Sequence, residues 1–408
     1  MGLALLSAIL LSGFYFAGKS GNNPDVYNND FNVYYHAARE IIAGNDPYAH
    51  SLGDWTPYIY PPLLAELLVP LAVLPLPVAA YLWYLINAAS IVLAAWCAVS
   101  LLTANGSGAA QTINPSSALW KEAVAAGAVI LVLRFVLDTL SLGQVNALVA
   151  ALVVAHLYLY FRGHRTLSAI ILALAISIKL IPALLLAYHI AKLRWRHVIA
   201  CAGVLIVLTA VSLLPFGKRG TDVLQVFVRR TISNQQGYDF SFSGNQSIRG
   251  AIGRFQSSKD NAINADARSA INWATVASAI ALLIIAAFVA AKSRNEMASA
   301  ASFFCLMVLL SPLSWKAHFV ILIPAAARLV CETRRMFAAL ICAAVFILFN
   351  FTSTRVLGVS AAEWADEHSL VLVGALLLFL ACVVLNVVVR KNKPESVAAY
   401  PTLNDSAA

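Results

Sequence analysis

Long apolar runs recur along this chain of 408 residues and constrain its fold more than any other feature. A helix needs about 20 mostly apolar residues to cross the hydrocarbon core of a bilayer, which is about 30 Å thick. Hydrophobic residues make up 61 % of the chain and charged residues only 12 %, too few to cover a water-facing surface. The runs are too long and too uniformly apolar for barrel strands, and a backbone in lipid must satisfy its own hydrogen bonds. The sequence therefore predicts an all-α, polytopic membrane protein.

The spacing of the runs predicts one helix bundle of about 11–12 transmembrane helices or half-helices. We expect residues 1–390 to form a single integral-membrane domain, followed by a polar cytoplasmic tail at 391–408. Two large loops, 19–76 and 216–269, are expected to be extracytoplasmic and to contain interfacial helices. The first run has no basic segment before it, so we expect a retained helix and not a cleaved signal peptide. The runs lie at approximately 1–18, 77–102, 120–140, 145–161, 166–191, 197–215, 270–292, 297–312, 315–330, 335–351 and 368–390.

Short basic clusters between the runs predict the orientation, because such clusters stay on the cytoplasmic face. If 166–191 is one helix, the first cluster and the last three fall on opposite sides of the membrane. Lys179 lies at the middle of this run, and Pro182 interrupts a helix just after it. A bent hairpin of two short helices, each rising about 18 Å, would place every cluster inside. A single kinked helix is the alternative. The clusters are Arg162/Arg165, Lys192/Arg194/Arg196, Lys292/Arg294, Arg334/Arg335 and Arg390/Lys391/Lys393.

The net charge of +9 is explained by these clusters, which suit cytoplasmic retention and anionic lipid phosphate. No basic tract is interleaved with aromatic residues, so we expect membrane lipid and not nucleic acid as a partner. The cysteines form no CxxC pair or ligand-like cluster, which argues against disulfides and a cysteine zinc site. They are Cys97, Cys201, Cys305, Cys331, Cys342 and Cys382.

The first outer loop carries a carboxylate close to an apolar helix end. Asp30 is followed at helical spacing by Phe31, Tyr34 and Tyr35. A carboxylate at the membrane interface, beside aromatic rings that could stack on a sugar, suits a general base. The alternative is that Asp30 only caps the helix that begins near Phe31.

Cationic side chains in three other segments are candidates for a phosphate site. Arg229 and Arg249 lie in the second outer loop, and arginine suits bidentate phosphate recognition, although an ordinary basic loop explains them equally well. His318 lies in a short connection and could contact a phosphate oxygen or serve only as an interfacial anchor. Lys179 is an ionisable residue at membrane depth, which indicates function and requires a buried partner or an anionic ligand.

Two amides in a tight turn are candidates for sugar recognition. Gln144 and Asn146 lie between two apolar runs, and their side chains could hydrogen-bond sugar hydroxyls. A simple turn with an N-cap explains them about equally well.

These pieces, in this order, resemble glycosyltransferase family 87, a group of membrane enzymes with the GT-C fold that use polyprenyl-phosphate sugars. The resemblance implies that Asp30 is the catalytic base, that His318 contacts the donor phosphate, and that Asn245 contributes to the sugar and acceptor site. Members often carry two consecutive histidines where this chain has Ala317 and His318, so only His318 can take that role. The matching stretches are DFNVYYHAAREIIAGNDPY (30–48), YPPLLAELLVPLAVLP (60–75), GQVNAL (143–148), KLIP (179–182), GNQSIRG (244–250) and SPLSWKAH (311–318).

The resemblance implies an inverting transferase that moves a sugar, mannose first among the candidates, from a polyprenyl-phosphate donor to a glycolipid or glycan hydroxyl. It implies an α-linkage, no cofactor and no metal, because the leaving group is already a phosphate monoester. We expect a multi-pass protein of a bacterial inner membrane whose site faces the periplasm or cell exterior. An arabinosyltransferase with the analogous donor is a close alternative. A transporter or lipid flippase is another, although the sequence shows no internal repeat.

Overall fold

The computed structural model describes residues 2–22, 29–49, 57–104, 117–237, 240–256, 265–293 and 295–391. These residues form helices and no β-strand, which confirms the all-α prediction. Arg294 and the tail after Lys391 lie outside the described residues, as do parts of both predicted loops. The helices are α1 (Gly2–Gly21), α2 (Asp30–Ile42), α3 (Pro62–Ala72), α4 (Leu76–Ala104), α5 (Ala118–Leu131), α6 (Leu133–Leu142), α7 (Asn146–Phe161), α8 (Arg165–Ile178), η2 (Ile181–Ala183), α9 (Leu184–Ala191), α10 (Trp195–Leu213), η3 (Leu214–Arg219), α11 (Gly220–Gly237), α12 (Ile248–Gln256), α13 (Ala265–Lys292), α14 (Glu296–Leu309), η4 (Lys316–Leu322), α15 (Ile323–Val330), α16 (Met336–Phe346), η5 (Ile347–Phe351), α17 (Thr354–Leu357), α18 (Val359–Glu367) and α19 (Leu370–Lys391).

The described residues include four helices that are long and apolar enough to cross a membrane. They become five if α5 and α6, which are bent by 69° at their junction, are counted as one broken span. Six further apolar helices have only 10–17 residues. The protein is therefore a polytopic membrane protein in which several apolar runs fold as short helices. The long segments are Leu76–Thr103, Trp195–Thr231, Asp266–Lys292 and Leu370–Val387.

The run around Lys179 is broken, as its sequence predicted. Lys179 has extended backbone angles (φ −150°, ψ 131°) at the end of α8, and Pro182 lies in η2 before α9 begins. The arms contain 14 and 8 residues and rise about 21 Å and about 12 Å, less than the hydrocarbon core. Elements this short are tolerated in a membrane only when other helices surround them.

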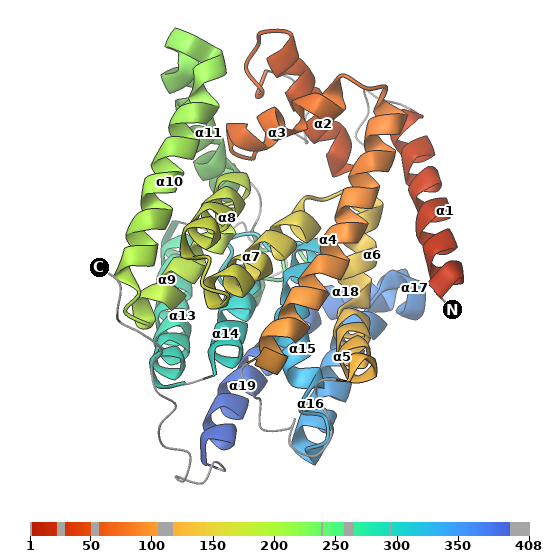
Figure 1. Cartoon of the computed structure of the whole chain (residues 1–408), viewed down its shortest axis with the longest axis vertical. Helices are drawn as coiled ribbons and strands as arrows, with labels where there is room; N and C mark the ends of the chain where they lie inside the picture. The colour runs from red at the N-terminus through yellow and green to blue at the C-terminus, as the bar shows by residue number, and fades with distance from the viewer. Residues whose placement is uncertain are drawn as a thin grey trace.

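Contacts with α7 show that the two arms form a hairpin. Near the start of α8, Ser168 hydrogen-bonds His156 through its hydroxyl, 2.8 Å from Nδ1. Near the end of α9, His189 Nε2 lies 3.0 Å from His156 Nε2. Lys179, at the tip, contacts Asn146 at the other end of α7. The first arm thus begins beside His156 and the second arm ends beside it, so the run forms the predicted hairpin and not a single kinked helix (Figure 1).

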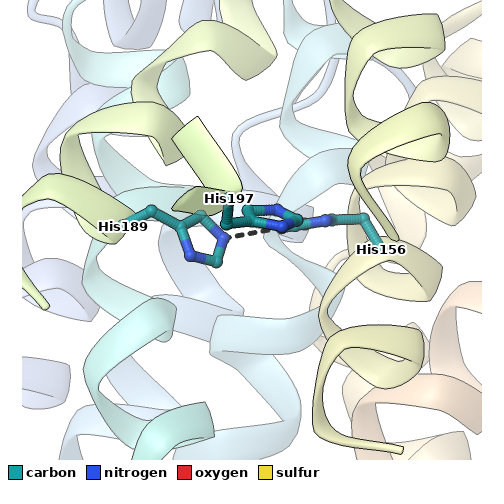
Figure 2. Close-up of side chains that lie close together, drawn as sticks. All are labelled: His156, His189 and His197. Atoms are coloured by element: carbon teal, nitrogen blue, oxygen red, sulfur yellow. Dashed lines mark hydrogen bonds between the residues drawn. The ribbon is translucent and has the colours of Figure 1, made fainter. Parts of the chain in front are cut away.

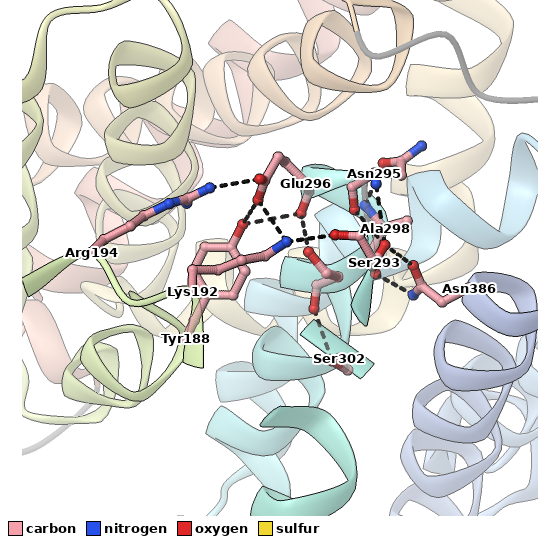
Figure 3. Close-up of polar contacts among 10 residues, drawn as sticks. Tyr188, Lys192, Arg194, Ser293, Asn295, Glu296, Ala298, Ser302 and Asn386 are labelled. Carbon is pink, nitrogen blue, oxygen red and sulfur yellow. Dashed lines mark hydrogen bonds and ion pairs between the residues drawn. The ribbon is translucent and has the colours of Figure 1, made fainter. Parts of the chain in front are cut away.

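A network around Glu296 joins several basic clusters at the end of the bundle where the hairpin begins and ends (Figure 3). Arg194 lies 2.6 Å from one Glu296 oxygen, and Lys192 lies 3.4 Å from the other and donates to Ser293 O. Asn386 of α19 accepts from the Ser293 hydroxyl at 2.9 Å. The cluster that contains Lys192 and Arg194 therefore contacts the segment just after Lys292.

The predicted outer loops meet away from this network. Arg230 of α11 donates to Tyr48 O at 2.7 Å, which joins the second loop to the first. The backbone N–H of Gln246 donates to Ser314 O at 2.9 Å. In Figure 1, α2, α3 and α11 lie together at the top of the view, whereas the ends of α16 and α19 lie at the bottom.

The hairpin fixes which segments should be reachable from outside an intact cell. The exposed Arg196 follows the hairpin and belongs to the predicted inner face, whereas the exposed Lys218 begins the second outer loop. We expect the cysteine of Arg196→Cys to resist a membrane-impermeant maleimide until the cells are permeabilised. The cysteine of Lys218→Cys should react in intact cells. Ready labelling of Arg196→Cys in intact cells would contradict this topology.

Candidate active site

Asp30 begins α2, but it does not cap this helix. The N-cap is Asn29, whose side-chain oxygen accepts from the backbone N–H of Asn32 at 3.1 Å. The Asn29 amide donates to Ser20 Oγ at 2.8 Å, and the Asn32 amide donates to Ser20 O, so α2 is anchored to the end of α1. The N-cap position that the capping alternative gave to Asp30 is therefore held by Asn29.

Lys179 lies at the centre of a cluster of polar side chains from three distant segments. Its Nζ donates to Asn146 Oδ1 at 2.7 Å and lies 3.0 Å from His318 Nε2. A lysine ammonium has no acceptor, so His318 Nε2 accepts this hydrogen bond and the ring proton belongs on Nδ1. The Asn146 amide donates to Gln144 Oε1. We call Gln144, Asn146, Lys179 and His318 the lysine cluster.

The turn before α7 holds two members of this cluster in place. Gly143 has a left-handed conformation (φ +62°), and its carbonyl oxygen accepts from Trp83 Nε1 at 2.7 Å. A Cβ at Gly143 would lie 2.6 Å from Phe16 Cζ and 2.9 Å from Phe31 Cβ. Glycine is thus required both by the backbone conformation and by the close approach of α1 and α2.

His318 is positioned by contacts of the segment around η4. The Thr139 hydroxyl donates to Ala317 O at 2.9 Å, which joins η4 to α6. Lys316 forms an ion pair with Asp366 in α18. The two residues before His318 are thus held by other elements, and the His318 ring lies against Lys179.

Asp30 interacts electrostatically with Lys179 and with Tyr60, which places its carboxylate beside the lysine cluster. Burial and, after it, the charge of Asp30 raise the pKa of the Tyr60 phenol. Lys179 Nζ lies 5.7 Å from the centroid of the Tyr60 ring, and Tyr34 OH donates to Tyr60 OH at 3.0 Å. Tyr60 is therefore a site residue that the sequence analysis did not single out, although it begins the YPPLL stretch.

A small cavity of about 10 Å³ adjoins this group. Asn146, Lys179 and His318 contribute polar atoms to its lining, and the remaining lining residues are aliphatic or methionine. A cavity of this volume holds no more than about one water molecule, so a lipid-linked donor would require these side chains to move apart.

Several other predicted site residues make their contacts elsewhere in the described part of the chain and do not touch the lysine cluster. The Tyr35 hydroxyl donates to Leu74 O at 2.8 Å, and Asn245 is fully buried, with its amide donating to Phe240 O and Pro312 O. Arg229 is exposed on α11. Arg249 stacks on the Phe240 ring at 4.5 Å and donates to Asn272.

Neighbouring arginines fasten the loops. Arg230 donates to Tyr48 O, as described above, and Arg254 donates to Phe242 O and Asn245 O, both at 2.9 Å. Arg230 and Arg254, in the second outer loop, therefore contribute to loop packing.

The arrangement has the components for displacing a phosphate. Asp30 can accept a proton, while Lys179 and His318 can hold negative charge in a water-poor site. The side chains of Gln144, Asn146 and Tyr60 surround these groups with hydrogen-bonding partners. This combination agrees with the sequence resemblance.

The model of glycosyltransferase family 87 matches residues 58–312, more than half of the chain. The chain belongs to glycosyltransferase family 87. The matched segment includes Tyr60, Asn146 and Lys179 and stops short of Asp30 and His318. Family membership and the apolar helices together make this chain a multi-pass membrane glycosyltransferase.

Relatives of this family member include named mycobacterial enzymes. The chain is 26 % identical over 331 residues to the polyprenol-phosphate-mannose-dependent alpha-(1-2)-phosphatidylinositol pentamannoside mannosyltransferase of Mycobacterium tuberculosis (strain CDC 1551 / Oshkosh), covering 79 % of the chain and 69 % of the relative. It is 25 % identical over 342 residues to the corresponding phosphatidylinositol mannoside mannosyltransferase of Mycolicibacterium smegmatis (strain ATCC 700084 / mc(2)155), covering 79 % and 73 %.

Gly143 and Gly163 offer a matched pair that tests the packing of the turn. Both have positive φ (+62° and +88°), but nothing lies within 4 Å of a Cβ at Gly163. Gly163→Ala should cost only the backbone strain, about 1–2 kcal/mol. Gly143→Ala should lower the melting temperature of the detergent-purified protein further, because it also separates α1 and α2 from the turn. Equal melting temperatures for the two variants would show that this packing is not required.

Proposed function

We propose that this family 87 member transfers a mannosyl group from a polyprenyl-phosphate donor to a glycolipid or glycan hydroxyl, with inversion to an α-linkage. The observation that carries the proposal is the meeting of one carboxylate, one ammonium and one imidazole. Asp30, Lys179 and His318 come from segments far apart in sequence and lie in one interacting group. The names of the mycobacterial relatives support mannose, a polyprenol phosphate donor and a phosphatidylinositol mannoside type of acceptor.

The reaction requires one proton acceptor. In the proposed step, Asp30 takes the proton of the acceptor hydroxyl as its oxygen attacks the anomeric carbon of the sugar. The bond from that carbon to the phosphate oxygen breaks on the opposite face, and the electron pair leaves with the polyprenyl phosphate. A positioned general base typically contributes about 10²–10⁴-fold to the rate.

The reaction also requires cations at the leaving group. The donor is a phosphodiester with one negative charge, and the departing monoester carries more. Fixed donors that meet this extra charge stabilise the transition state more than the bound substrate. Lys179 and His318 take this role in the proposal, so no divalent metal is needed for the transfer.

The remaining predicted residues have supporting roles in the proposal. Tyr34 and the two amides, Gln144 and Asn146, line the region where the sugar would lie. Arg229 and Arg249 would attract the lipid phosphate before it reaches the lysine cluster. The site would face the periplasm or cell exterior, the side opposite the basic clusters.

The central prediction concerns Asp30→Asn, which preserves the shape of the side chain and removes the base. With polyprenyl-phosphate mannose carrying a radioactive label, purified wild-type protein should label a more polar glycolipid. Asp30→Asn should lower this rate at least about 100-fold without changing the melting temperature. Asp222→Asn, at an exposed position in α11, is the matched control and should keep the wild-type rate. An unchanged rate for Asp30→Asn would exclude this residue as the base.

A second prediction separates transition-state charge from ground-state binding. Lys179→Met and His318→Gln should each lower kcat about 10–100-fold, with a smaller rise in KM for the donor. Lys218→Met changes an exposed lysine outside the cluster and should leave both constants unchanged. A rise in KM alone would contradict a role for the cluster in stabilising the leaving group.

A further inference from the structure

Three buried histidines meet at the end of the bundle opposite the lysine cluster. His156 lies in α7, His189 in the second arm of the hairpin, and His197 in α10, and Figure 2 shows their rings converging. One ligand nitrogen from each ring lies within 4.8 Å of the others. His156 and His189 are 0 % exposed and His197 is 5 % exposed. We call these residues the histidine cluster.

The hydrogen bonds of His156 direct a lone pair toward the centre of the cluster. Its Nδ1 lies 3.1 Å from the carbonyl oxygen of Ser168, which can only accept, so Nδ1 carries the ring proton. Its Nε2 is then a lone-pair nitrogen 3.0 Å from His189 Nε2. A backbone carbonyl that accepts from one ring nitrogen and orients the other is the usual support of a metal-binding histidine.

The other two rings have polar atoms that nothing in the described part of the chain satisfies. His189 Nδ1 and both nitrogens of His197 are buried and have no hydrogen-bond partner. A buried polar atom without a partner is destabilising, so three of them in one place need an explanation. His197 stacks on His156 at 5.3 Å between centroids, which brings its nitrogens against the same space.

We propose that the histidine cluster binds one divalent transition-metal ion, with zinc as the fitting ion. Imidazole nitrogens suit zinc, and three of them with one open position form a known coordination pattern. Zinc–nitrogen bonds of about 2.0–2.1 Å place tetrahedral ligand nitrogens about 3.4 Å apart. The 3.0 Å between the His156 and His189 nitrogens would therefore open slightly, and the wider spacing in the group, up to 4.8 Å, would close.

A carboxylate beside the cluster offsets part of the positive charge of its basic neighbours. Arg194 lies over the Tyr160 ring at 4.7 Å, and that ring contacts His197 at 4.8 Å. The Arg194 guanidinium is paired with Glu296 at 2.6 Å, and Glu296 also faces Lys192. The carboxylate therefore offsets the positive charge that would otherwise repel the ion.

Such an ion would connect three elements that determine where Lys179 lies. It would hold α7 to the returning arm of the hairpin and to α10, on either side of the tight turn at Leu193 (φ +57°). The ion would be separate from the transfer reaction, since His156 lies ten residues from Asn146 along α7. The proposal does not depend on the proposed function.

The test is metal binding by the full-length protein, purified without a polyhistidine tag and stripped with a chelator. Cobalt is the probe, because tetrahedral Co²⁺ absorbs visible light and Zn²⁺ should displace it. Wild type should bind one ion per chain, and its melting temperature should rise on adding Zn²⁺. His197→Phe keeps the aromatic packing but offers no ligand, so it should lose both effects.

Two further variants complete the design. His164→Gln replaces an exposed histidine at the same end of the bundle and should bind metal as wild type does. His189→Gln is a second ligand variant in case His197→Phe does not fold, and it should also lose the cobalt spectrum. If wild type binds no ion, or binds no more than the folded ligand variants, the histidine cluster is only an aromatic contact and the proposal is overturned.

Discussion

The position of one charged amine at the tip of a broken hairpin is the constraint on which the rest of this structure depends. An ionisable residue at membrane depth is costly unless polar partners surround it. Asn146 and His318 supply those partners, and each requires its own support: the glycine turn before α7 for Asn146, and the contacts of η4 for His318. The hairpin arms are too short to span lipid, so they must lie among other helices. Two requirements therefore coincide in this structure. Lys179 must have polar partners, and the short hairpin must be surrounded by other helices.

The two ends of the bundle perform different tasks. Toward the outer loops, α2 presents Asp30 beside Lys179 and Tyr60, where an acid and a cation can act on opposite sides of a reacting carbon. At the other end, Glu296 and the histidine cluster hold the hairpin arms against α7, α10 and α14. The end proposed to be catalytic thus takes its side chains from helix starts, loops and the hairpin tip, and the supporting end takes them from helix termini. This division follows a general pattern in which a rigid scaffold positions functional groups carried on loops.

Local patterns in the sequence predicted much of this fold, but they did not predict which side chains meet. The break in the helix follows from Lys179 and Pro182, and the distribution of basic clusters favoured a hairpin. Tyr60 was missed because a single tyrosine in a short motif gives no sign of which helix it will face. Arg249, which packs on Phe240, was a candidate for the phosphate site, since a guanidinium that packs a loop and one that binds phosphate look alike in sequence. The histidine cluster was missed because His156 is 33 residues from His189 along the chain, far outside any local ligand spacing.

The most direct test of the central claim is a structure of the protein bound to the product lipid, polyprenyl phosphate. Electron cryomicroscopy of the protein in a lipid nanodisc would locate both the phosphate and the start of the isoprenoid chain. The account predicts a phosphate oxygen within hydrogen-bonding distance of Lys179 Nζ and of a protonated ring nitrogen of His318, with the Asp30 carboxylate across the sugar position. A phosphate held by Arg229 and Arg249 alone, with Lys179 still enclosed by Asn146 and His318, would contradict it.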